Sequence, residues 1–115
     1  MQYLLLIYRN ERAMLSAGKQ RIGETKAAYA AYTEAMKKAG AYVGGNRLQP
    51  TSTAKTVRAP QGKRQAVDGP YIETKEQLGG YYLIEVPDAE AALSWAARCP
   101  GADHGAIEVR PVWVT

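Results

Sequence analysis

The segment with the clearest chemical potential covers residues 68 to 80 and reads DGPYIETKEQLGG. Asp68 ends a predicted strand and precedes Gly69 and Pro70, so a strained turn there could aim its carboxylate inward as an acid or base. Asp-Gly and Gly-Pro are also turn-forming dipeptides, in which the aspartate bonds to the backbone just downstream. The residues alone therefore leave two interpretations of Asp68 open, a functional acid and a turn former.

Three further side chains could take part in chemistry. Tyr29 lies on the apolar stripe of a predicted helix, where it could bind a ligand or pack in the core; a phenol, with a pKa near 10, is a poor base at neutral pH. His104 is the chain's only histidine, and together with Asp103 it does not provide the three or four ligands of a metal site. Cys99 has only Arg98 as a visible activating neighbour, so we expect a buried packing residue. Neither a metal nor a cofactor is expected.

The glycine pair at the end of the segment has a structural interpretation. Gly79 and Gly80 lead into a strand, without the Gly-x-x-x-x-Gly-Lys pattern of a phosphate-binding loop. We expect a β-bulge there, or a place where two backbones approach closely.

Length and composition limit the class of protein. The 115 residues predict one domain, residues 1–115, and 46% hydrophobic with 23% charged residues is typical of a globular chain. A single cysteine excludes an internal disulfide. The longest wholly apolar run, residues 4–7, is far below the roughly 20 residues of a membrane span. With no signal-peptide pattern at the start, we expect a cytoplasmic protein and no membrane partner.

The net charge of +4 is unevenly distributed. Residues 35–67 hold seven basic and no acidic side chains, which leaves eight basic and eleven acidic ones elsewhere, a net charge of −3. These charges are spread singly and without interleaved aromatic residues, which is atypical of a nucleic-acid platform. We therefore interpret them as a solvated edge that discourages aggregation, and nucleic acid as a minor alternative.

The order of predicted elements indicates an α+β fold. We expect strands at residues 2–9, 42–48, 53–58, 64–68, 80–86 and 106–113, helices at residues 22–39 and 89–98, and a loop at residues 9–18. This order is that of a ferredoxin-like sandwich with an inserted β-hairpin. Because both helices would cover one face of the sheet, we expect a second copy to cover the other in a homodimer.

Several stretches resemble the YCII-related proteins of the DGPF type: the segment above, Tyr3-Leu4-Leu5-Leu6-Ile7-Tyr8, Val43-Gly44-Gly45, Leu48-Gln49-Pro50, Trp95-Ala96-Ala97-Arg98-Cys99-Pro100 and Glu108-Val109-Arg110-Pro111-Val112. The resemblance implies a fold of the dimeric α+β barrel type and an association of some relatives with extracytoplasmic-function sigma factors. It also implies a pocket with an aspartate, for which Asp68 is the candidate, and a histidine. Tyr29 occupies the expected histidine position, and Tyr71 stands where many relatives have phenylalanine.

Two functions from different classes remain open, so the sequence does not decide whether the chain is an enzyme. The first is a homodimeric small-molecule-binding or regulatory accessory protein that holds a small polar or anionic ligand between the sheet and the first helix, with Tyr29, Tyr71 and Arg110 as candidate ligand-binding residues. The second is a cofactor-independent lyase or isomerase, with Asp68 as base and Tyr29 or Arg110 stabilising developing charge. The missing helix histidine favours the first.

Overall fold

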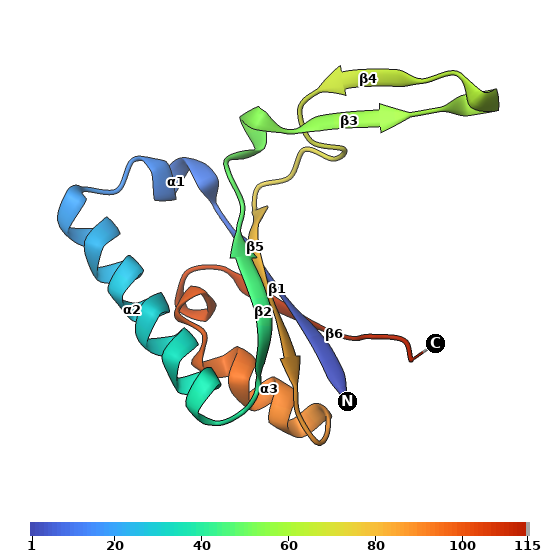
Figure 1. Ribbon diagram of the computed structural model, residues 1–115. Coiled ribbons are helices and arrows are strands. Elements are labelled where there is room, and N and C mark those ends of the chain that lie inside the picture. Colours follow the sequence, from blue (N-terminus) through green and yellow to red (C-terminus); the bar gives the residue numbers. More distant parts are fainter. Residues whose placement is uncertain (115) are drawn as a thin grey trace.

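A four-stranded antiparallel sheet in the order β2-β5-β1-β6 organises the computed structural model, which describes residues 1–114 (Figure 1). The elements follow in the order β1 (Gln2–Arg9), α1 (Glu11–Leu15), α2 (Lys19–Lys38), β2 (Tyr42–Arg47), η1 (Thr51–Thr53), β3 (Lys55–Arg58), η2 (Pro60–Gly62), β4 (Gln65–Asp68), β5 (Gln77–Glu85), α3 (Ala89–Arg98), η3 (Pro100–Asp103) and β6 (Ala106–Pro111), where η marks a 3₁₀ turn. This α+β, ferredoxin-like topology with a hairpin between β2 and β5 confirms the predicted fold class.

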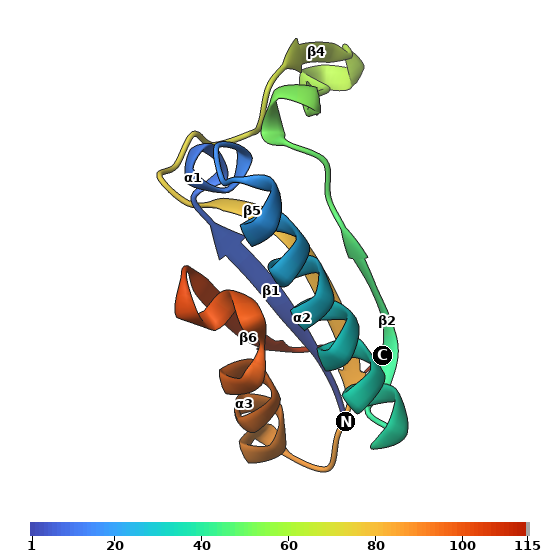
Figure 2. The ribbon, with the colours of Figure 1, turned by 90° about the vertical axis from the view of Figure 1, so that its left-hand side faces the viewer.

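The core is built on one side of strand β1. Its side chains alternate across the sheet, and Tyr3, Leu5 and Ile7 are buried beneath the helices. Both α2 and α3 cover this single face, as Figure 2 shows. They complete the core together with β5 through Tyr32, Met36, Tyr82, Ile84, Ala92 and Ala96.

The segment predicted as a loop, residues 9–18, contains a short helix instead, and α2 begins at Lys19. The side chain of Asn10 caps α1, because its Oδ1 atom accepts a hydrogen bond from the Ala13 backbone N–H at 2.9 Å. The sequence prediction of a loop over residues 9–18 included Asn10 among its polar residues. The apolar stripe predicted for α2 is buried at Tyr32 and Met36, whereas Ile22 is 42% exposed because the first half of the helix extends beyond the core.

Helix α2 ends before Gly40 and helix α3 begins after Asp88, as the sequence predicted. Gly40 terminates α2 with a φ of +74°, and the Ala41 N–H then bonds to the Met36 carbonyl. Asp88 caps α3 by accepting from the Ala91 N–H at 2.9 Å. None of the helices in the described chain is long and apolar enough to cross a membrane.

Strand β5 contains the predicted bulge. Ile7 pairs with Gly80 whereas Tyr8 pairs with Leu78, so Gly79 has no partner on β1. Beyond the bulge the pairing of the two strands continues, so that Arg9 lies opposite Gln77.

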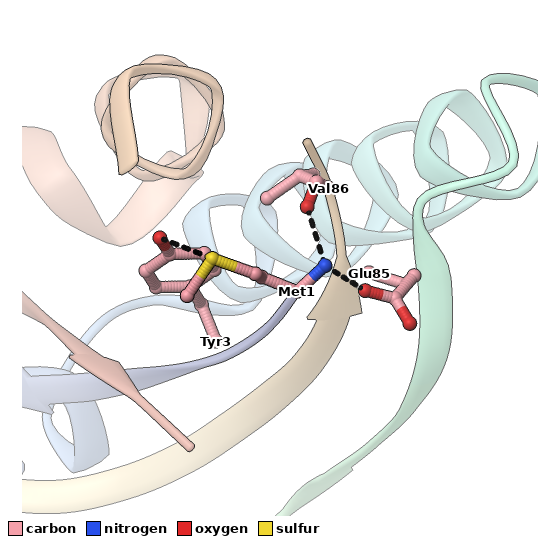
Figure 3. A network of polar contacts seen from close by, with 4 residues as sticks. All are labelled: Met1, Tyr3, Glu85 and Val86. Atoms are coloured by element: carbon pink, nitrogen blue, oxygen red, sulfur yellow. Dashed lines mark hydrogen bonds and ion pairs between the residues drawn. The ribbon is translucent and has the colours of Figure 1, made fainter. Parts of the chain in front are cut away.

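The first residue fixes the start of β1 to the end of β5 (Figure 3). The Met1 ammonium lies 2.5 Å from a Glu85 carboxylate oxygen and donates to the Val86 carbonyl at 2.9 Å. The Tyr3 hydroxyl donates to the Met1 sulfur at 3.9 Å. Because the ion pair is about half exposed, it aligns the two strands more than it stabilises the fold.

The second face of the sheet, here called the open face, is apolar at its centre. Leu4, Leu6 and Tyr8 of β1 lie beside Tyr81 and Leu83 of β5, and all five are partly exposed. Nothing in residues 1–114 packs over them as the helices do over the other face.

The inserted hairpin forms an arm, defined here as residues 55–68 with strands β3 and β4. Its strands pair only with each other, from Lys55 opposite Asp68 to Arg58 opposite Gln65. Figure 1 shows that the arm leaves the end of the sheet and points to the side opposite α2. In the view of Figure 2, with the helices in front, the arm is correspondingly foreshortened.

Candidate functional site

The buried row of β1 ends in a charged residue. Arg9 continues the alternation of Tyr3, Leu5 and Ile7 and therefore points to the helix side of the sheet. Its Nε atom is buried and has no hydrogen-bond partner among the described residues. A buried donor without a partner costs free energy, so its presence here indicates a place for an acceptor that the chain itself does not supply.

The Arg9 side chain lies across the bulge of β5. A Cβ atom placed on Gly79 would lie 2.6 Å from Arg9 Nε and 3.0 Å from its Cζ atom. Glycine at this position leaves room for the guanidinium, whereas a larger residue would require the Arg9 side chain to move.

A cavity of about 300 Å³ lies beside the guanidinium, where the ends of β1 and β2 meet α1. Eight residues line this arginine pocket: Arg9, Glu11, Met14, Leu15, Arg47, Leu48, Gln49 and Pro50. Arg47 ends strand β2, and its guanidinium contacts the Met14 sulfur at 4.0 Å. Two cationic side chains on a partly apolar wall form a site suited to an organic anion.

The two arginines of this pocket outnumber its one carboxylate, Glu11, so the lining keeps a net positive charge. Burial lowers the pKa of Arg9 and the nearby positive charge of Arg47 lowers it further, whereas Tyr29 and Glu11 act in the opposite direction. Neither arginine forms one of the ion pairs found in residues 1–114. An anion would relieve the repulsion between the two guanidinium groups.

The one carboxylate that lines the pocket is already occupied. Glu11 accepts hydrogen bonds from the Thr51 backbone N–H at 2.6 Å and the Thr51 hydroxyl at 2.7 Å. The Glu11 backbone N–H donates to the Gln77 side chain at 2.9 Å. Glu11 therefore joins α1 to the chain after β2 and to β5, and holds the wall of the pocket in place.

Tyr29, on α2, is half-buried against η3 and does not line the arginine pocket. Its hydroxyl accepts a weak hydrogen bond from the Cys99 thiol at 4.0 Å, and a Cβ on Gly101 would lie 2.6 Å from the hydroxyl oxygen. Burial raises the pKa of Tyr29 well above the ordinary value of a phenol, and Cys99 raises it further, whereas the charge of Arg9 acts in the opposite direction. Tyr29 is therefore a neutral hydrogen-bond donor and a poor base.

The structure places Asp68 and Tyr71 at the base of the arm. The Asp68 carboxylate bonds to Lys55 Nζ at 2.7 Å, and its side chain is 87% exposed. Tyr71 is 67% exposed and lies beneath the Arg58 guanidinium, 5.0 Å from it. The chain does not bring these two residues together with Tyr29.

The remaining candidates lie elsewhere. Arg110 pairs across β1 with Leu4, so it belongs to the open face, where its Nε atom bonds to Glu108 at 3.0 Å. His104 is exposed at the end of η3, and Cys99 is buried with 2% exposure. Residues 1–114 contain no cluster of three or more metal-ligating side chains.

Sequence reasoning missed Arg9 and Arg47. The signal for Arg9 was present, because it occupies the next position in the buried alternation of β1 and therefore lies on the core side of the sheet. Arg47 gave no comparable signal, since its approach to Arg9 depends on the pairing of β2 and β1 with opposite edges of β5.

Comparison with known proteins agrees with the fold. The family model of the YCII-related domain matches residues 1–115, and the chain belongs to this family. An uncharacterized protein of Rhizobium meliloti is 34% identical over 114 residues, which cover 97% of this chain and 92% of the relative. Among solved structures, the 5-chloro-2-hydroxyhydroquinone dehydrochlorinase of Burkholderia phenoliruptrix AC1100, in complex with 2,5-dihydroxybenzoquinone, is similar with a TM-score of 0.53 and 19% identity, over 98% of this chain and 94% of the other. The last similarity shows a shared fold.

The contact between Arg9 and Gly79 is testable by a double-mutant cycle. Gly79→Ala should destabilise the protein by about 1–3 kcal/mol in urea unfolding, because the new methyl group displaces a half-buried guanidinium. In an Arg9→Ala background the same substitution should cost much less. Gly44→Ala is the matched control, since no atom lies within 4 Å of its added Cβ. Equal costs of Gly79→Ala in both backgrounds would contradict this placement of Arg9.

The buried tyrosines predict a loss of stability at alkaline pH. Burial raises the pKa of Tyr29, Tyr32 and Tyr82, so above pH 10, the ordinary phenol value, the unfolded chain releases protons that the folded chain retains. The free energy of unfolding should therefore fall as pH rises above 10, by at most about 1.4 kcal/mol per pH unit for each tyrosine. Urea unfolding between pH 8 and about 11 measures the slope. Tyr29→Phe should make it shallower, and an unchanged slope would show that Tyr29 ionises freely.

Proposed function

We propose that this protein binds a small organic anion in the arginine pocket and acts as a homodimeric binding or regulatory accessory protein. The observation that carries the proposal is the buried, unpartnered Nε atom of Arg9 next to a second guanidinium, Arg47. Planar carboxylates fit best, because a guanidinium can bind their two oxygens with two parallel hydrogen bonds. Tyr29 does not line this pocket, so the proposal does not depend on its hydroxyl.

Binding without turnover has more support than catalysis. A general base needs a free carboxylate or imidazole within reach of the ligand. Glu11 is engaged by Thr51, Asp68 is paired with Lys55 on the arm, and His104 is on the surface. A lyase or isomerase that uses Asp68 would need its carboxylate to reach the pocket from elsewhere, for example from a second copy of the chain. A link to sigma factors would give the bound anion a regulatory role.

Anion binding is testable by thermal unfolding in the presence of salicylate, malonate, inorganic phosphate and 2,5-dihydroxybenzoquinone. At least one of these anions should raise the unfolding temperature, since a ligand at 100 times its Kd adds about 2.7 kcal/mol of stability. Arg9→Met and Arg47→Met should abolish the shift while keeping the apolar part of each side chain. Arg12→Ala, on the same helix as Met14 but outside the pocket lining, is the matched control.

Two further comparisons sharpen the outcome. Salicylamide, the neutral analogue of salicylate, should give no shift, and Asp68→Ala should keep the full shift of the wild type. A shift that survives in both arginine variants would place the ligand elsewhere. A shift lost in Asp68→Ala would instead bring the arm carboxylate into the site and revive the enzyme hypothesis.

The homodimer is supported by the open face. Its apolar centre, formed by Leu4, Leu6, Tyr8, Tyr81 and Leu83, is partly exposed in one chain. Glu108 and Arg110 form an ion pair on the β6 side of this surface. An apolar centre beside a polar margin is typical of protein interfaces, and a two-fold axis would let two copies bury the same surface against each other.

Light scattering at micromolar concentration tests the dimer. Wild type should have a mass of about 25 kDa, twice the 12.5 kDa of the chain. Leu6→Asp should give monomers, because a charge buried in the apolar centre is costly. Leu93→Asp should remain dimeric, since Leu93 is 51% exposed on α3, on the helix side. A monomeric wild type would refute this assembly.

A further inference from the structure

The arm lacks the packing that a two-stranded ribbon requires. All of its strand residues are exposed except Thr56, which is intermediate. Val57 is 56% and Val67 is 65% exposed, on opposite faces of the ribbon because they oppose Ala66 and Thr56. An isolated hairpin is only marginally stable in water, so this arm needs a surface to pack against.

The base of the arm is nevertheless well fixed. The Gly69 N–H donates to the Ala54 carbonyl at 2.7 Å, and the Thr56 hydroxyl donates to the Gly69 carbonyl at 2.9 Å. Lys55 and Asp68 add an ion pair at the same level. These bonds hold the direction in which the arm leaves the sheet.

The direction of the arm indicates what it packs against. Figure 1 shows the arm extending past the sheet on the side opposite α2, which is the side of the open face. The chain end with Val112, Trp113 and Val114 leaves the sheet toward the same side, and Trp113 is 91% exposed. A body seated on the open face would therefore lie between the arm and the chain end.

One face of the arm is turned toward the space over the open face. Thr56, opposite Val67, bonds to Gly69, and Arg58, on the same ribbon face, stacks on Tyr71. The segment that contains Gly69 and Tyr71 folds back beneath the arm in Figure 1. The inner face of the arm therefore carries Val67, and the outer face carries Val57.

We infer that the arm clasps a second copy of this chain, with the Val67 face packed on the partner subunit. The inference rests on the homodimer proposed above. A second copy accounts for three observations together. It would cover the open face and lie in the space beneath the arm, and it would provide the apolar contact that the arm lacks in the single chain. By two-fold symmetry each copy would hold the other, so the arm would contribute twice to every dimer.

Paired substitutions of the two valines test this inference. Val67→Asp should raise the dimer dissociation constant at least tenfold in sedimentation equilibrium, because it places a charge in an apolar contact. Val57→Asp, on the outer face, should change the constant less than threefold. Both valines are exposed in the single chain, so neither variant should unfold the subunit.

A second variant removes the arm altogether. Replacement of residues 55–68 by an Asn-Gly turn is compatible with the base, since the Gly69 N–H already bonds to the Ala54 carbonyl. This variant should also weaken the dimer at least tenfold, and circular dichroism should show an intact sheet. In the wild type, the arm amides should exchange hydrogen slowly in the dimer and rapidly after dilution to the monomer.

The outcomes separate the two proposals. A wild-type monomer refutes the dimer, and the clasp with it, but leaves anion binding in the arginine pocket untouched. A dimer that neither Val67→Asp nor arm removal weakens refutes the clasp alone. The arm carries four basic residues and one acidic residue, so duplex DNA at low salt is the alternative occupant. DNA binding that is lost on arm removal, with an unchanged dimer, would overturn the inference.

Discussion

The alternation of side chains along β1 is the constraint on which the rest of the structure depends. Because this strand lies between β5 and β6, its two rows of side chains meet two different environments. Tyr3, Leu5 and Ile7 are buried under the helices and form the part of the core that β1 contributes. The opposite row is apolar but uncovered among the described residues, so the same strand that forms the core also forms the centre of the open face.

The same alternation produces the candidate site. Arg9 is the next residue in the buried row, and it keeps its place because the bulge at Gly79 removes the side chain that would block it. A guanidinium is thereby held at the edge of the core beside Arg47, and neither arginine forms an ion pair among the described residues. A buried Nε donor without a partner is costly in the free protein, and a bound anion would compensate for this cost.

The inserted hairpin gives the fold a second level of organisation. Between β2 and β5 a tight turn would have completed the ferredoxin-like sheet, yet the chain builds an exposed ribbon on a firmly bonded base. A ribbon whose strand residues are exposed except for Thr56 is costly to order, and partner packing would compensate for this cost. Lys63 and Arg64 near its tip are exposed, and that such charges discourage edge-to-edge aggregation stays a prediction.

The sequence by itself determined the fold class, the bulge, the long helices and their caps, because these depend on local periodicity, capping residues and glycine conformations. It also determined the family. It did not show where its candidate residues lie relative to one another: Asp68 and Tyr71 lie at the base of the arm, Arg110 on the open face and Tyr29 beside the core. Only the tertiary structure brought Arg9 and Arg47 together, because their proximity depends on the sheet order, in which strands distant in the chain become neighbours through β5.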